Sequence, residues 1–302
     1  FITLLIGLEY ISQEFYRYLI LEDKQIEASI GLFIRTTLWA LPIAIYGFEI
    51  GKVNVEFVVF FWVIGVVLSI VYYLIIVKNK FKYLWGNFFD QREIFNWVVE
   101  GIKSSFKFLL ATLLIKILFT VDRKALKLFS GAEEVAVYAF LMSFAMVIYT
   151  VVDSLVLSYS YPQILKQKPI IDDYYVMLKK ISIIVIITGF FSLMLMRFSV
   201  FILDLNEVYL NYPVYVSLSV AIGFYSLSMV PHYFLYSSKM DKLIVFSHFF
   251  VAIMGFFIIF SLQENQGHVI MSIKMAVIMS LLFFIKHLIW MIVRTQNDKK
   301  YV

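Results

Sequence analysis

The strongest constraint on this chain is a series of apolar stretches, each long enough to cross a lipid bilayer as one helix. Stretches of about 17 to 25 apolar residues span a hydrocarbon core of about 30 Å. Eight of them can be marked, at residues 26–46, 55–77, 105–121, 135–159, 181–203, 212–236, 243–262 and 269–293. The chain is 62% apolar and 16% charged, whereas a soluble domain is about 45 to 50% apolar. We therefore predict an all-α, polytopic integral membrane protein.

The first residues are apolar but too few to cross a membrane by themselves. Residues 1–8 precede the first charged residue, and the chain begins with Phe rather than Met. We expect them to be the end of a further span, so that the sequence is a fragment. The chain has no cysteine, which excludes disulfides, thiolate catalysis and Cys-ligated metal.

Basic residues between the spans predict the orientation. Seventeen Lys and Arg residues fall in one alternating set of connections, and four fall in the other, namely Lys52, Arg123, Lys124 and Lys127. Cytoplasmic connections carry the excess of Lys and Arg. The richer set and the C-terminus are therefore predicted to be cytoplasmic.

The longest inward connection, residues 78–104, mixes aromatic side chains with Lys and Arg. This mixture is typical of an amphipathic segment at the inner membrane interface. It also suggests a boundary between two helical lobes, at residues 1–100 and 101–302. The outward connections are short and offer no extramembrane domain.

Single basic residues lie inside five of the predicted spans, and they are Arg35, Lys116, Arg197, Lys274 and Lys286. A cation at bilayer depth costs roughly 2.5 to 3.5 kcal/mol on insertion scales. Arg35 lies about 13 Å from either end of its span, whereas Lys116, Arg197 and Lys274 lie near enough to an end to snorkel. Several such cations in one bundle favour a polar lumen that accepts an anion.

Polar residues recur at helical spacing in three spans. One stripe combines Ser105, Thr112, Lys116, Thr120 and Arg123; a second combines Tyr138, Met142, Tyr149 and Asp153; a third combines Ser217, Tyr225, Ser228, His232 and Tyr236. Such spacing places side chains on one helix face. We expect these faces to line a water-filled cavity, with helix packing as the alternative. The Asp153 side chain is too short to reach the interface and needs a partner or water. We expect a role in the lumen, with a structural ion pair or a helix–helix hydrogen bond as the alternative.

Signatures of enzymes are weak. The sequence contains no Gly-rich phosphate loop, no His-Glu-x-x-His and no Asp-x-Asp pair of the kind that holds a metal. The four histidines lie in different spans and connections. We expect neither an enzyme nor a metal site.

Two segments carry a family resemblance. Residues 9–19 read EYISQEFYRYL and residues 32–39 read LFIRTTLW, and they are followed by SSFKFL at 104–109 and VDRKAL at 121–126. Ser130 and Gly131 with residues 137–139 agree as well. These stretches resemble the Wzx-type flippases of O-antigen and capsule repeat units, within the multidrug, oligosaccharidyl-lipid and polysaccharide (MOP) exporter superfamily. The pattern to which they belong covers about half of the chain.

The resemblance implies a protein of twelve spans in two lobes, of which this chain would hold the end of the fourth span and the fifth to twelfth. It implies transport of an undecaprenyl-diphosphate-linked oligosaccharide across the bacterial cytoplasmic membrane by rocking of the lobes. The polysaccharide polymerase and chain-length machinery would be further partners; nucleic acid would not.

Site residues follow from that task. Arg35, Lys116 and Lys286, with Arg123 at the outer mouth, would bind the diphosphate. Tyr138 and Tyr149 would stack on sugar rings, and Asp153 would carry a coupling H⁺ or Na⁺. No other cofactor is expected. The alternatives are a multidrug exporter of the same superfamily, which would favour an anionic lumen, and a membrane polymerase or ligase, which would need a large outward loop.

Overall fold

All secondary structure in the described part of the chain is helical. The computed structural model describes residues 2–50, 54–84, 91–166, 171–261 and 267–298. The helical segments in chain order are α1 (Ile2–Leu21), α2 (Gln25–Phe33), η1 (Ile34–Leu38), α3 (Ala40–Ile50), α4 (Val55–Leu84), α5 (Gln91–Ser130), α6 (Ala132–Val152), η2 (Asp153–Leu157), α7 (Ser158–Lys166), α8 (Ile171–Ile202), η3 (Glu207–Leu210), α9 (Tyr212–Leu227), α10 (Met229–Ser237), α11 (Asp241–Phe260) and α12 (His268–Asp298). They form two compact units, Phe1–Asn96 and Trp97–Val302.

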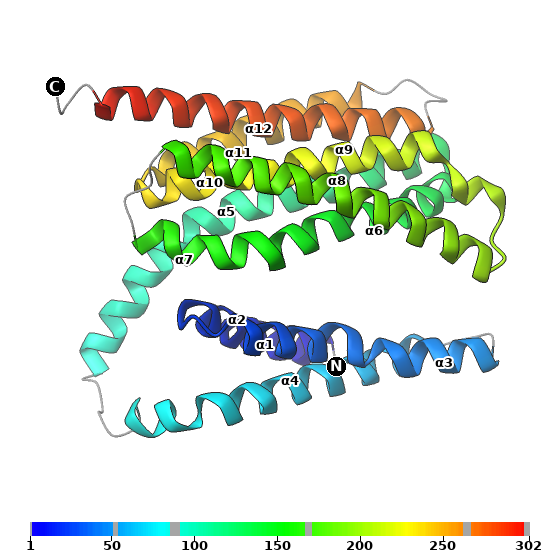
Figure 1. Ribbon diagram of the computed structural model, residues 1–302. Helices are drawn as coiled ribbons and strands as arrows, with labels where there is room; N and C mark the ends of the chain where they lie inside the picture. The colour runs from blue at the N-terminus through cyan, green and yellow to red at the C-terminus, as the bar shows by residue number, and fades with distance from the viewer. Residues whose placement is uncertain (1, 51–53, 85–90, 167–170, 262–266, 299–302) are drawn as a thin grey trace. The chain divides into compact units, whose positions relative to one another are not determined.

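The first unit is held together by the packing of α1 and η1 on α4 (Figure 1). Leu5, Ser12 and Leu19 are buried at a spacing of seven residues, which keeps them on one face of α1. The Ser12 and Ser69 hydroxyls are hydrogen-bonded at 2.8 Å, joining α1 to α4. The helix therefore continues past Leu8, through a segment that hydropathy alone assigns to a connection.

The second unit is built around α9. Helices α12, α6 and α8 pack on α9, and α11 packs on α12 (Figure 1). One apolar core joins α5, α6, α9, α11 and α12, and a second joins η2, α7, α8 and α10 to the C-terminal part of α12. Because a membrane supplies no hydrophobic force between helices, close packing of these side chains holds the bundle together.

Seven helical stretches within the described residues are long and apolar enough to cross a membrane. They cover 25–47, 55–78, 132–165, 171–202, 212–237, 241–260 and 268–295, and each overlaps one predicted span. The remaining predicted span, 105–121, lies inside α5 and is not one of the seven. Some of the side chains at its beginning lie outside the described residues. The chain is thus a multi-pass membrane protein.

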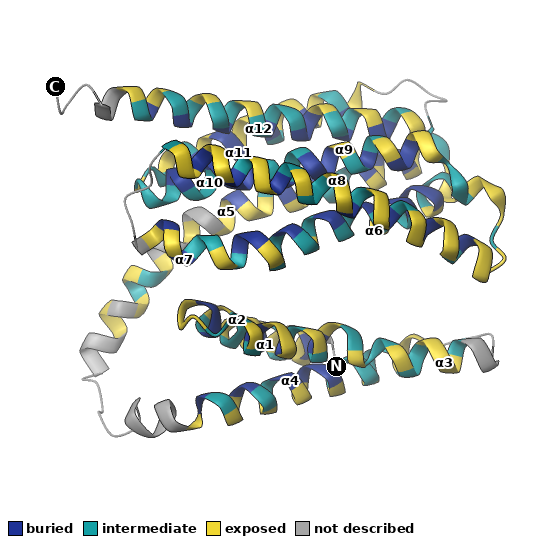
Figure 2. Cartoon of the chain, in the orientation of Figure 1, coloured by how far each residue is buried: buried dark blue, intermediate teal, exposed yellow. Residues whose placement is uncertain are grey.

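The outward faces of these helices are apolar, as a lipid environment requires. On α8, Ile186, Ile187, Phe190 and Phe198 are each at least 60% exposed within this chain. Figure 2 shows such exposed positions along the helices of both units. In water these faces would be an aggregation hazard, whereas in a bilayer they are solvated by lipid.

Several predicted spans contain local breaks in the α-helix. The span at 25–47 contains the π-helical segment η1, and the span at 132–165 contains the π-helical segment η2. The span at 212–237 divides at Ser228 into α9 and α10. A π-bulge widens one turn and is frequent at functional sites. Arg35 lies in η1 and Asp153 is the first residue of η2, so both charges occupy such a segment.

The predicted amphipathic connection, 78–104, is occupied by the ends of α4 and α5. Residues 85–90 and most of the neighbouring side chains lie outside the described residues. Its amphipathic character stays a prediction, as does the assignment of the two units to lobes of a particular superfamily.

Candidate functional site

The first candidate group surrounds Arg35 in the interior of the first unit. Arg35 is 9% exposed, and its Nε lies 3.6 Å from Oε2 of Glu9 on α1. The other oxygen of Glu9 accepts a hydrogen bond of 2.7 Å from the Trp62 indole. The ring of Trp62 stacks on that of Trp39, with centroids 5.5 Å apart. The indole bond thus fixes the carboxylate that faces Arg35.

The guanidinium of Arg35 keeps unused donors. Its Nε and Nη1 are buried and have no hydrogen-bond partner in the part of the chain that the structure describes, since the 3.6 Å to Glu9 is too long for a hydrogen bond. Arginine presents five donors in a planar fork that matches carboxylate and phosphate oxygens. Glu9 offsets part of the charge and leaves the fork able to bind an anion.

The stripe predicted on α5 lies on the surface of the second unit. Thr112, Lys116, Thr120 and Arg123 are all exposed, whereas Ala111, Ile115, Leu118 and Asp122 are buried. The Thr120 hydroxyl donates a hydrogen bond of 2.9 Å to the Lys116 carbonyl of the same helix. Lys116 and Arg123 therefore share a face of α5 that the second unit does not cover.

Tyr138 belongs to the core of the second unit. Its side chain is fully buried, and its hydroxyl donates to Oδ2 of Asp122 at 2.8 Å. The other carboxylate oxygen accepts from the Arg123 backbone N–H at 2.6 Å. A ring in this position joins α5 to α6 and has no face free for a sugar. Sequence reasoning missed Asp122 as a partner, although it lies in the VDRKAL stretch.

Asp153 lies beside a pair of tyrosines. The rings of Tyr149 on α6 and Tyr225 on α9 have centroids 5.0 Å apart, which brings the second and third predicted stripes together. The Asp153 carboxylate interacts electrostatically with both hydroxyls. No described side chain donates a hydrogen bond to this carboxylate, so it is available to a cation or a proton.

Lys286 lies in the interior of the second unit. It is fully buried, and its Nζ has no hydrogen-bond partner among the described residues. Lys286 interacts electrostatically with His232 on α10 and His248 on α11. The two imidazole rings lie 5.7 Å apart. Sequence reasoning treated these histidines as scattered, because their helices meet only in the fold.

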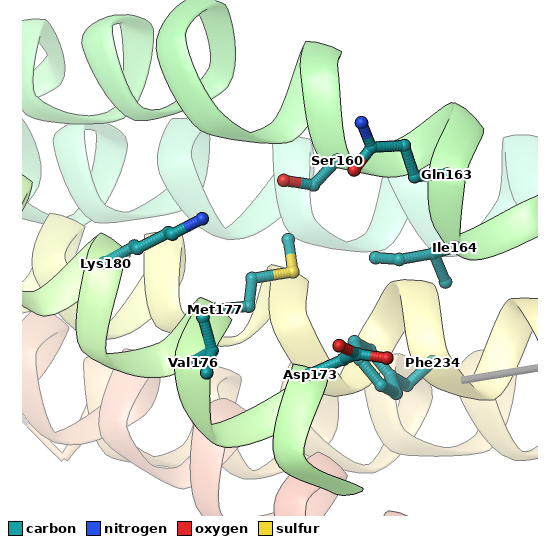
Figure 3. A pocket seen from close by; sticks show the side chains of 8 residues that line it. All are labelled: Ser160, Gln163, Ile164, Asp173, Val176, Met177, Lys180 and Phe234. Carbon is teal, nitrogen blue, oxygen red and sulfur yellow. The ribbon is translucent and has the colours of Figure 1, made fainter. Parts of the chain in front are cut away.

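A polar cavity of about 130 Å³ opens between α7, α8 and α10. Figure 3 shows its lining, with Ser160, Gln163 and Ile164 on α7, Asp173, Val176, Met177 and Lys180 on α8, and Phe234 on α10. With one lysine beside one aspartate it holds little net charge. It suits water molecules better than a diphosphate.

An apolar groove of about 440 Å³ is also present. It is lined from α6, α8 and α9, where Gly189, Ser219 and Gly223 leave room between larger apolar side chains. Apart from the Ser219 hydroxyl, which has no hydrogen-bond partner among the described residues, its lining is almost entirely apolar.

Two further cations of the predicted spans, Arg197 and Lys274, are not enclosed by other side chains. Arg197 is exposed, and Lys274 donates to the Ser261 hydroxyl at 3.1 Å near the end of its helix. His268 instead joins three helices: its backbone N–H and Nδ1 both contact Glu134, and its Nε2 is 2.8 Å from Asn211. Within the described residues, no three His, Asp or Glu side chains gather into a metal site.

No protein-family model, curated protein or solved structure matches this chain. The assignment of function therefore rests on the residues themselves.

Proposed function

We propose that this chain belongs to a flippase that moves undecaprenyl-diphosphate-linked oligosaccharide repeat units across the bacterial cytoplasmic membrane, for O-antigen or capsule biosynthesis. The observation that carries the proposal is Arg35. It is a mid-span arginine whose Nε and Nη1 are buried and find no hydrogen-bond partner among the residues described. A group so costly to place in a membrane suits an anion that must cross it.

The chemistry of such a substrate fits this arrangement. Its diphosphate offers several anionic oxygens, and charge-assisted hydrogen bonds from a guanidinium are about twice as strong as neutral ones. Lys116 and Arg123, exposed on α5, supply further cations on a face that the second unit leaves open. The multi-pass fold and the resemblance of the LFIRTTLW segment support the same reading.

Complementation tests the proposal. The intact gene would be expressed in a flippase-deleted host that makes a matching repeat unit, and surface polysaccharide would be measured together with protein abundance in the membrane. We expect wild type to restore the glycan and Arg35→Ala to abolish it at normal abundance. Arg35→Lys should restore part of it, because charge is kept and the planar fork is lost.

Arg197→Ala is the matched control, since Arg197 is an exposed arginine in another span. We expect it to behave as wild type. Full restoration by Arg35→Ala would remove Arg35 from the substrate path. Failure of wild type with several repeat units would overturn the flippase assignment.

A multidrug exporter is the second candidate, and Asp153 favours it. A carboxylate close to the hydroxyls of Tyr149 and Tyr225 is a suitable site for a lipophilic cation, which binds aromatic rings and carboxylates alike. Resistance of cells to tetraphenylphosphonium that depends on Asp153, without glycan restoration, would select this function.

A further inference from the structure

Lys286 is the least compensated buried charge in the described residues of the second unit. It lies on α12, is fully buried and has no hydrogen-bond partner. No carboxylate oxygen of a described residue lies within ion-pair distance of its Nζ. An ammonium with three donors and no acceptor is strongly destabilised by burial, whereas a neutral amine in the same place is tolerated.

Two imidazoles on neighbouring helices interact electrostatically with this amine. The Nδ1–H of His248 donates to the Ile244 carbonyl at 2.7 Å. That bond fixes its tautomer and leaves Nε2 as a base. His232 is half-buried next to it, and its buried Nδ1 has no hydrogen-bond partner among the described residues. The interior between α10, α11 and α12 thus holds three nitrogen bases.

The other helices that pack on α12 do not neutralise this group. Tyr225 of α9 and Tyr149 of α6 are directed to one another and to Asp153. At the next helical turn of α12, Trp290 packs on Phe234 at 5.3 Å, and its indole nitrogen is unpaired as well. Within the described residues the cluster therefore combines three bases and no counter-ion.

One of the three helices has a weakened connection. Helix α10 begins after Ser228, and Pro231 lies within its first turn. Proline has no N–H, so the Leu227 carbonyl receives no hydrogen bond from position 231. His232, the next residue, thus follows a gap in the backbone hydrogen bonds between α9 and α10.

We propose that Lys286, His232 and His248 form a binding site for one transported or coupling proton in the second unit. Proton binding creates a cation that the closed site cannot stabilise, so it favours a state in which α10 moves and water or an anion reaches Lys286. Release of the proton restores the closed packing. The coupling role rests on the proposed transport function, whereas proton binding does not.

Proton binding is measured on the purified intact protein in nanodiscs. Potentiometric titration between about pH 5 and pH 8, where histidine titrates, would compare wild type with Lys286→Met. This substitution keeps a long unbranched side chain and removes the amine. The matched control is Lys274→Met, a lysine of the same helix that is partly exposed and hydrogen-bonded to Ser261. Tryptophan fluorescence reports the neighbouring Trp290 in parallel.

We expect wild type and Lys274→Met to take up about one proton more than Lys286→Met, with a fluorescence change that only Lys286→Met lacks. His232→Gln should reduce the uptake if the bases act together. Equal uptake by wild type and Lys286→Met, both shown to be folded by gel filtration, overturns the site.

Coupling is tested in liposomes with a fluorescent polyprenyl-diphosphate N-acetylglucosamine as the probe. One proton exchanged per probe sustains a distribution ratio of about ten per pH unit, because one unit is a tenfold ratio of proton activity. We expect this ratio for wild type and a ratio near one for Lys286→Met. A ratio that Lys286→Met preserves overturns coupling at this site. A probe that wild type never moves overturns the proposed function and leaves the titration to decide the proton site.

Discussion

Tyr138 donates its hydroxyl hydrogen to Asp122 at 2.8 Å, and both side chains are fully buried. The bond joins α5 to α6 in the interior of the second unit. A buried carboxylate depends on such donors, since it cannot be solvated by water or lipid.

Tyr138→Phe leaves Asp122 without its side-chain donor. We expect a loss of about 1 to 3 kcal/mol in the free energy of unfolding, because an unsatisfied buried acceptor retains its full desolvation cost. Thermal unfolding of the detergent-purified protein measures it. Tyr212→Phe, at a 42% exposed tyrosine, is the control and should change stability by less than about 0.5 kcal/mol. Equal stabilities of the two variants would contradict the structural role of the bond.

Gly31 gives Tyr73 its place in the first unit. A Cβ at Gly31 would overlap ring atoms of Tyr73, which is fully buried and donates to the Ala28 carbonyl at 3.2 Å. We expect Gly31→Ala to destabilise the protein by about 1 to 3 kcal/mol through overpacking. Gly7→Ala is the matched control, because nothing lies within 4 Å of its added Cβ; it should be neutral or stabilising by up to about 1 kcal/mol. Unfolding titrations of both variants decide this.

Glu9 sets the charge that Arg35 offers to an anion. Glu9→Gln keeps an acceptor for the Trp62 indole but removes the negative charge 3.6 Å from Arg35. We expect a lower melting temperature of the free protein, because a buried charge loses its counter-ion. The stabilisation by added polyprenyl diphosphate should in turn be larger than for wild type.

The control for that variant is Glu14→Gln, at an exposed ion pair with Arg17. Such surface pairs contribute about 0 to 1 kcal/mol. Thermal shifts with and without the lipid measure both effects. A ligand shift in Glu9→Gln no greater than in Glu14→Gln would argue against anion binding at Arg35.

Glu134 joins the N-terminal ends of α6 and α12 through His268. Glu134→Ala removes the acceptor of the His268 backbone N–H and of its imidazole, and we expect a loss of about 1 to 3 kcal/mol. Glu133→Ala, at the exposed neighbour, should be close to neutral. Hydrogen exchange at the first turn of α12 locates the effect; protection that survives Glu134→Ala would show that the contact is dispensable.

Helical spacing predicted which residues share a face, but not what covers that face. Thr112, Lys116, Thr120 and Arg123 lie on one exposed side of α5, as their spacing requires. Tyr138, predicted from the same reasoning to line a cavity, is buried against Asp122 instead. The position of a stripe around one helix is local, whereas its neighbour depends on how that helix is rotated in the bundle.

For the buried charged residues too, the sequence predicted some features and left others to the tertiary structure. Arg35, Asp153 and Lys286 were singled out because a charge at bilayer depth is costly wherever it lies in the fold. The residues around these charges were not predicted. Glu9 lies in a segment that hydropathy assigns to a connection, and His232 and His248 belong to separate helices.

The sequence by itself determined that this chain is a multi-pass helical membrane protein and that a few of its charges need an explanation. The hydropathy and the length of an apolar stretch depend only on residues that are neighbours in the sequence, so membrane-spanning helices can be predicted without tertiary information. Only the tertiary structure decided that Glu9 faces Arg35 and that two imidazoles face Lys286 without a carboxylate. Those relationships depend on the pairing and rotation of helices distant in sequence, which close packing of side chains selects.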